Sequence, residues 1–138
     1  MTQENQNIGK PSIHLLASES DMVADMALRI EHDRPVVAAM LLGELERADL
    51  HDLNSLPAHA VRIGSTIEYL DETTRCVRTV TLVLPRDANI TEGRISILTP
   101  MGAALYGLLA GSSINWPTLD GEERCLSILS VSPPISAE

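Results

Sequence analysis

The chain has 138 residues, of which 44% are hydrophobic and 21% are charged, and this length and composition support one compact domain with at most a small appendage. Aromatic residues make up 2% of the chain, which argues against an aromatic cage or a base-stacking groove. Lysine and arginine number 10 against 19 aspartates and glutamates, and the resulting net charge of −9 disfavours direct binding to the phosphate backbone of DNA or RNA.

Targeting and ligand-binding patterns are sparse. No hydrophobic run approaches the ~18 residues that a membrane span requires, and the polar stretch Met1 to Lys10 lacks the features of a secretory signal. We therefore expect a soluble, cytoplasmic protein with no membrane partner. Cys76 and Cys125 form no CxxC motif, and the 4 histidines have no zinc-binding spacing. We expect reduced cysteines, no bound metal and no cofactor.

Two amphipathic helices are predicted within residues 18–48. In the first, hydrophobic side chains recur at the spacing of one helix face: Met22, Met26 and Ile30, flanked by Val23 and Ala27. The polar segment 31–34 interrupts this pattern, and Pro35 suits the first turn of a second helix. The hydrophobic row of the second helix is Val37, Leu41 and Leu45. Two short helices joined by a tight polar turn predict an antiparallel helical hairpin.

Beyond Pro57 the hydrophobic spacing changes from helical to alternating. We therefore assign residues 1–57 to an N-terminal tail and hairpin, and residues 58–138 to a second unit. Strands are expected at 65–70, 75–84, 94–98, 113–116 and 124–131, with turns at 71–74 and at Asp120–Gly121. Thr99 and Pro100 supply the N-cap and the first residue of a helix that ends at Leu108.

The expected fold class is α+β. A short N-terminal antiparallel helical hairpin is followed by a five-stranded, antiparallel and strongly curved sheet with one packed helix. The alternation in residues 75–84 is typical of a strand with one buried face, and the helix that begins at Pro100 would cover that face.

Three stretches together resemble the bacterial Gre transcription elongation factors. Residues 95–107, ISILTPMGAALYG, followed by AGSSI (110–114), WP (116–117) and DG (120–121), are similar to the ISxxSPxGxALxG…GD segment of the Gre C-terminal domain. Residues 61–67, VRIGSTI, resemble the VxxGSxV strand that opens this domain. ELERA (44–48) with Leu56–Pro57 is more similar to the short branch called regulator of nucleoside diphosphate kinase, or Rnk-like. The resemblance covers Pro35 to Val131 and implies an FKBP-like C-terminal domain.

The resemblance also implies a partner and a docking surface. In Gre factors the Ser-Pro turn of the C-terminal domain lies on the surface that grips a coiled coil of RNA polymerase at the rim of its secondary channel. The corresponding residues of this chain are Leu98, Thr99, Pro100 and Met101. Thr99 replaces the serine of the family, and Leu98 stands where some Gre factors have an acidic residue or asparagine.

The turn between the two predicted helices bears on catalysis. Gre factors carry a long coiled coil whose acidic tip helps to bind a catalytic Mg²⁺, and Glu31 and Asp33 stand at the corresponding turn of this chain. Helices of about 12 to 15 residues project only ~20 Å, so we expect these carboxylates to fall short of the active centre. The neighbouring His32 and Arg34 dilute the negative field that a Mg²⁺ site needs. We therefore expect no catalytic residue and no metal ligand.

The sequence leaves four functions to be compared. The favoured one is an RNA polymerase-binding regulator, not an enzyme, that docks at the secondary channel entrance and competes with other channel-binding factors without transcript cleavage. The alternative is a Gre-type factor that stimulates transcript cleavage, which needs a longer hairpin. A prolyl isomerase with an FKBP-like fold would need an aromatic-lined pocket, for which this chain has few residues. Direct control of a nucleoside diphosphate kinase has no supporting motif.

Overall fold

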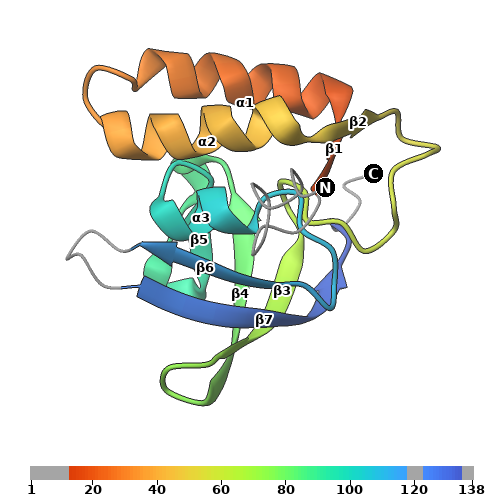
Figure 1. Cartoon of the computed structure of the whole chain (residues 1–138), viewed down its shortest axis with the longest axis vertical. Coiled ribbons are helices and arrows are strands. Elements are labelled where there is room, and N and C mark those ends of the chain that lie inside the picture. Colours follow the sequence, from red (N-terminus) through yellow and green to blue (C-terminus); the bar gives the residue numbers. More distant parts are fainter. Residues whose placement is uncertain (1–12, 118–122, 135–138) are drawn as a thin grey trace, which may run out of the picture.

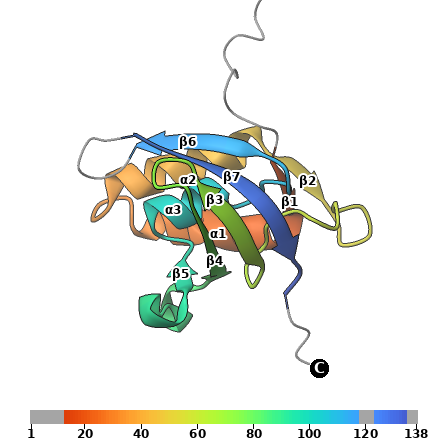
Figure 2. The same ribbon diagram turned by 90° about the horizontal axis from the view of Figure 1, so that it is seen from below.

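The structure is a computed structural model that describes residues 13–117 and 123–134. Its elements in chain order are β1 (His14–Leu16), α1 (Ala17–Arg29), α2 (Pro35–Arg47), β2 (Asp49–His51), β3 (Thr66–Asp71), β4 (Cys76–Val83), the 3-10 turns η2 (Pro85–Asp87) and η3 (Ile90–Glu92), β5 (Arg94–Ser96), α3 (Pro100–Leu105), β6 (Ser113–Pro117) and β7 (Glu123–Ser132). The helices lie on one side of the main sheet, with α3 beneath α2 (Figures 1 and 2). The predicted turn at Asp120–Gly121 lies outside the described residues.

Helices α1 and α2 have 13 residues each and pack side by side (Figure 1). The buried centre of α1 is formed by Val23 and Ala27. Each of them follows a methionine of the predicted hydrophobic row by one position. Pro35 is the first residue of α2, as predicted. Within the described ranges, none of the helices combines the length and the hydrophobicity needed to cross a membrane.

A short parallel pair of strands, β1 and β2, holds the base of these helices, and the hydrophobic spacing of the sequence does not predict it. His14 to Leu16 pair with Asp49 to His51. The Asp49 amide donates to the Ile13 carbonyl at 3.0 Å, and the His14 amide donates to the Gly107 carbonyl at 2.9 Å. The pair therefore joins the start of α1 and the end of α2 to the segment that follows α3.

The main sheet has 5 strands in the order β5-β4-β3-β7-β6. The prediction that every pairing is antiparallel is wrong at one edge, because β5 pairs with β4 in parallel. Residues 84–93 form the turns η2 and η3, and this connection returns the chain so that β5 enters in the direction of β4. A register shift between Glu68 and Tyr69, where β3 pairs with β7, is a bulge that increases the local twist of the curved sheet.

Helix α3 is shorter than predicted and ends at Leu105 instead of Leu108. Gly107 has a φ of 85°, in the left-handed region, which ends the helical path. The chain then turns back, and the Gly107 amide and the Leu108 carbonyl both hydrogen-bond to Val61. A Cβ at position 107 would lie 2.8 Å from the Leu15 side chain, so glycine also allows β1 to approach.

The hydrophobic core is continuous between the helices and the sheet. Val23 and Ala27 of α1 and Leu41 of α2 belong to the same buried cluster as Ile67 and Leu126 of the sheet. Burial of this apolar surface is the main term that holds the helices on the sheet. A cooperative loss of both parts on denaturation follows from this shared core.

One buried polar interaction fixes α1 on this core. The hydroxyl of Tyr106, which is fully buried, donates to Glu19 Oε1 of α1 at 3.0 Å. The Ile63 amide donates to the same oxygen at 3.3 Å, and Arg62 Nε lies 3.8 Å from Glu19 Oε2. Burial, together with the Glu19 carboxylate, raises the pKa of Tyr106 far above its ordinary value. The tyrosine therefore stays a neutral donor to the carboxylate of Glu19, whose side chain is 11% exposed.

Replacing Tyr106 with phenylalanine removes this donor while keeping the ring. Because the largely buried Glu19 carboxylate loses one of its partners, we expect the free energy of unfolding at neutral pH to fall by about 1 to 3 kcal/mol. Urea denaturation followed by circular dichroism measures this change. An unchanged midpoint and slope would contradict the proposed importance of the contact.

The same contact makes the free energy of unfolding depend on pH in the alkaline range. The raised pKa of Tyr106 means that its contribution is complete below the ordinary tyrosine pKa of ~10 and is lost as the pH rises above that value. Between about pH 9 and about pH 11, the wild type should therefore lose stability faster than Tyr106→Phe. Parallel pH profiles for the two proteins would argue against ionisation of this residue as the cause.

Candidate docking site

The residues predicted to dock, Leu98 to Met101, form the entry to α3, and we call them the docking turn. Thr99 caps the helix, because the Gly102 amide donates to its side-chain oxygen Oγ1 at 3.0 Å. The same hydroxyl donates to the Ser96 carbonyl at 2.7 Å, and the Leu98 amide donates to Ser96 Oγ at 2.9 Å. These bonds stabilise the backbone conformation of the turn.

Close packing behind the docking turn explains the glycine at position 102. A Cβ at Gly102 would lie 2.1 Å from the Ser96 carbonyl oxygen and 3.0 Å from Ile97 Cα. Backbone atoms cannot move aside as a flexible side chain can, so only glycine fits here. The motif glycine is therefore required by the close approach of α3 to β5.

The residues of the docking turn are unequally exposed. Leu98 is 7% exposed and contributes to the core, whereas Thr99, Pro100 and Met101 are half-buried. The sulfur of Met101 accepts a long hydrogen bond of 3.9 Å from the Tyr69 hydroxyl. A partner that meets this turn would therefore contact Thr99 to Met101 more than the Leu98 side chain.

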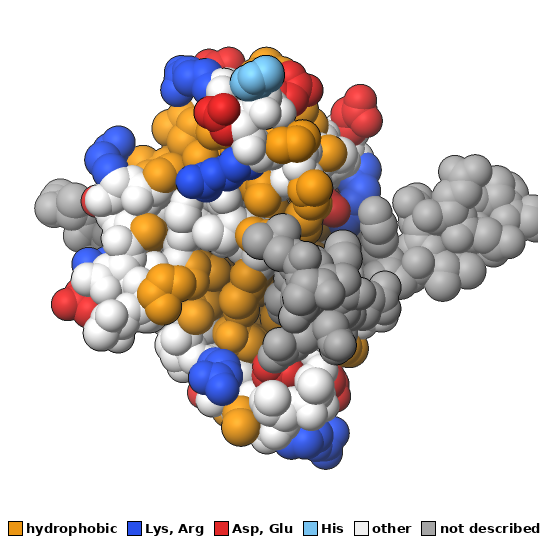
Figure 3. Space-filling view, turned by 90° about the vertical axis from the view of Figure 1, so that its left-hand side faces the viewer, with side chains coloured by type: hydrophobic (Ala, Val, Ile, Leu, Met, Phe, Trp, Pro, Cys, Tyr) orange, Lys and Arg blue, Asp and Glu red, His pale blue; other side chains and the backbone are white. Residues whose placement is uncertain are grey.

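The start of α2 adjoins the docking turn, which the sequence did not predict. Pro35, Val36 and Val37 line a groove of about 440 Å³ together with residues 98–100 of the docking turn, and Val36 is 57% exposed. Figure 3 shows this end of the molecule, where charged side chains gather over the turn between α1 and α2 and hydrophobic side chains form a band beneath it. The docking turn and the helices thus present one mixed surface.

The turn between α1 and α2 carries the predicted tip residues Glu31 and Asp33, and both are exposed. Next to them, Arg34 Nη1 donates to the Leu98 carbonyl at 3.3 Å. The tip is therefore bonded to the docking turn. Among the residues that the structure describes, no group of three or more histidine, cysteine, aspartate or glutamate side chains is arranged to hold a metal ion.

The remaining candidate ligands serve other contacts. His14 Nδ1 and His51 Nε2 lie 3.0 Å apart across β1 and β2, and Asp49 Oδ2 is 3.8 Å from His14 Nδ1. The spacing of these histidines in the sequence gave no indication that they meet. Cys76 is exposed and Cys125 is half-buried, and neither forms a disulfide.

The fold and the docking turn define a domain of the type found in Gre transcription factors. Residues 56–133 match the family described as "Transcription elongation factor, GreA/GreB, C-term". The Regulator of nucleoside diphosphate kinase of Escherichia coli K12 is 32% identical over 93 residues, which are 67% of this chain and 68% of that protein. The chain belongs to the GreA/GreB family of transcription elongation factors, as the three similar stretches of its sequence predicted.

Other relatives match more of the chain. The transcription elongation factor GreA of Rhodospirillum rubrum is 30% identical over 118 residues, covering 80% of this chain and 75% of that protein. A solved structure, the prokaryotic transcription elongation factor GreA/GreB from Nitrosomonas europaea, superposes with a TM-score of 0.71 at 29% identity. It covers 90% of this chain and 100% of its own, so the likeness includes the helices as well as the sheet.

Two glycine substitutions test the packing of the docking turn. Gly102→Ala should destabilise the fold by about 3 kcal/mol or more, because the new methyl group overlaps a backbone carbonyl. Gly43→Ala is the matched control, since a Cβ at this exposed position of α2 meets nothing within 4 Å. Alanine there should stabilise the helix by about 0.5 to 1 kcal/mol. Thermal denaturation compares the two variants, and a similar shift in both would refute the packing argument.

Proposed function

We propose that this protein is a transcription regulator that binds RNA polymerase at the entrance of its secondary channel, competes there with other channel-binding factors, and has no enzymatic activity. The observation that carries the proposal is the match of residues 56–133 to the GreA/GreB C-terminal domain, which includes the docking turn. In this proposal residues 58–138 form the FKBP-like docking unit, and residues 1–57 form the tail and the short helical hairpin.

The geometry of the docking turn supports binding. Thr99 and Gly102 hold the turn rigidly, so little conformational entropy is lost when a partner binds. Pro100 and Met101 within the turn, and the exposed Val36 beside it, offer apolar contact area. The net charge of −9 keeps the protein away from the nucleic acid that the polymerase holds.

The helices support a role without transcript cleavage. Each has 13 residues and is therefore ~20 Å long, and the bond from Arg34 to the Leu98 carbonyl keeps their tip beside the docking turn. A carboxylate must come within ~2 Å of Mg²⁺ to act as a direct ligand. Glu31 and Asp33 would remain near the channel rim, where competition by excluded volume needs no contact with the metal.

A second candidate function is stimulation of transcript cleavage. The observation in its favour is that Glu31 and Asp33 are both exposed at the tip, where a Gre factor would carry its acidic residues. The Arg34 contact would have to break before this tip could extend toward the channel. The cleavage assay below separates the two candidates.

The proposed docking turn is tested by Pro100→Asp. Aspartate is favourable in the first turn of a helix, so α3 should remain folded while a charge enters the apolar surface. We expect the affinity for core RNA polymerase to fall about tenfold or more, measured by fluorescence anisotropy of the labelled protein. Val77→Asp, at a 55% exposed position on β4, introduces the same charge elsewhere and should bind as the wild type. Equal binding by both variants would remove the docking turn from the interface.

The absence of cleavage is tested with arrested elongation complexes that carry labelled RNA. The protein alone should produce no shortened RNA in the presence of Mg²⁺, and it should inhibit cleavage stimulated by a Gre factor in proportion to its concentration. Cleavage by the protein alone that disappears in a Glu31→Ala, Asp33→Ala variant would establish the second candidate instead. Failure to inhibit the Gre factor at large excess would contradict a shared docking site.

A further inference from the structure

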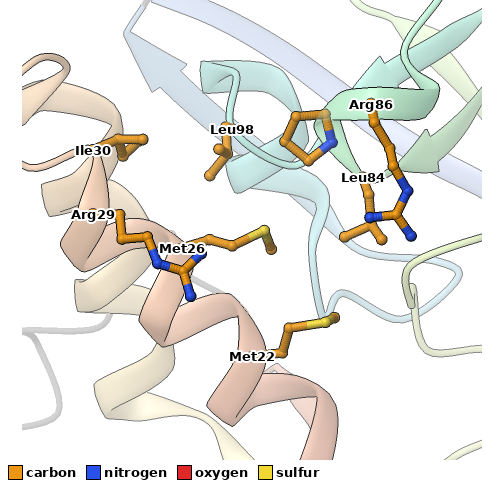
Figure 4. Close-up of a pocket in the computed structure, with 8 residues that line it drawn as sticks. Met22, Met26, Arg29, Ile30, Leu84, Arg86 and Leu98 are labelled. Atoms are coloured by element: carbon orange, nitrogen blue, oxygen red, sulfur yellow. The ribbon is translucent and has the colours of Figure 1, made fainter.

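A second groove lies on the other side of Leu98, between α1 and the segment that follows β4 (Figure 4). We call it the methionine groove, and its volume is about 450 Å³. Its apolar lining includes Met22, Met26, Leu84 and Leu98, and its walls carry Arg29 from α1 and Arg86 from η2. The two arginines stand on opposite walls with the apolar residues between them (Figure 4).

The apolar lining of this groove is accessible and adaptable. Met22 is 40% exposed and Met26 is half-buried, while the neighbouring Val23 and Ala27 supply the buried contacts of α1 with the core. The hydrophobic row predicted for this helix, which includes Met22 and Met26, therefore remains partly open to a partner. Methionine side chains are flexible and polarizable, so such a surface can adjust to an incoming apolar group.

The two arginines differ from most of the others in the described part of the chain. Glutamate partners lie within 4.0 Å of four arginines, namely Arg47, Arg62, Arg75 and Arg94. Neither Arg29 nor Arg86 has an ion pair or a hydrogen-bond partner for its guanidinium within those described residues. In a protein with 19 acidic residues, two unpaired cations thus face one apolar groove. This charge is complementary to carboxylates on either side of an apolar side chain.

We propose that the methionine groove receives an apolar side chain from an acidic segment of RNA polymerase, whose carboxylates pair with Arg29 and Arg86. The inference rests on the proposed function and adds a second anchor to the docking turn. Leu98 lines both grooves, so one continuous partner surface can cover them together. Carboxylates that pair with the two arginines would also set the orientation of the partner. An orientation that placed positive charges of the partner against Arg29 and Arg86 would be repelled.

The test measures the affinity of the full-length protein for core RNA polymerase after reversal of these charges. Arg29→Glu and Arg86→Glu are compared singly and together, and Arg78→Glu, at an exposed position on β4 outside the groove, is the matched control. We expect a loss of about tenfold or more for the double variant and no change for the control. The variant Arg29→Gln, Arg86→Gln should show a weaker dependence of binding on salt, because both charges are removed.

Each outcome decides the inference. If Pro100→Asp weakens binding but the double charge reversal does not, the methionine groove is not an anchor, while the proposed function stands. If the wild type does not bind the polymerase at all, the proposed function fails and the inference fails with it. If sedimentation shows a wild-type dimer that the double reversal dissociates, the occupant is a second copy of this chain and the inference is wrong. Circular dichroism melting curves verify that each variant is folded.

Discussion

The hydrogen bond between Tyr106 and Glu19 connects the two halves of this protein. Tyr106 follows α3, and Glu19 lies in the first turn of α1, 87 positions away in the sequence. A charged oxygen in a largely buried position is stable only when donors surround it, and the Tyr106 hydroxyl and the Ile63 amide meet that need. This arrangement, together with the shared hydrophobic core, sets the position of α1 on the sheet, and α2 packs against α1.

With α1 fixed in this way, the turn between the helices reaches the start of α3. Arg34 bonds to the Leu98 carbonyl, so the helical part and the sheet part contribute to one surface. The grooves on either side of Leu98 each take residues from both parts. The short hairpin thus has a structural role of its own, because its tip contacts the docking turn and its helices line the two grooves beside that turn.

Local chemistry made much of this fold predictable from the sequence. Thr99 and Pro100 begin α3 as expected, and Pro35 begins α2, because capping and the fixed φ of proline act on adjacent residues. The direction of β5 and the pairing of β1 with β2 depend on contacts between distant segments, which hydrophobic spacing does not encode. The two grooves beside Leu98 were not predicted, for the same reason. The spacing of Met22 and Met26 identified a helix face but not the neighbour that would cover it.

The edge strands of the main sheet, β5 and β6, affect how readily the protein aggregates. A sheet edge with free amides and carbonyls can recruit a strand from another molecule. Strand β5 has 3 residues, and the turns η2 and η3 pack against it, with Asn89 bridged to Arg94. At the opposite edge, β6 has 5 residues and ends at Pro117, which has no amide hydrogen to donate. Both edges of the main sheet are therefore poor templates for the recruitment of a strand from another molecule, and thus for aggregation.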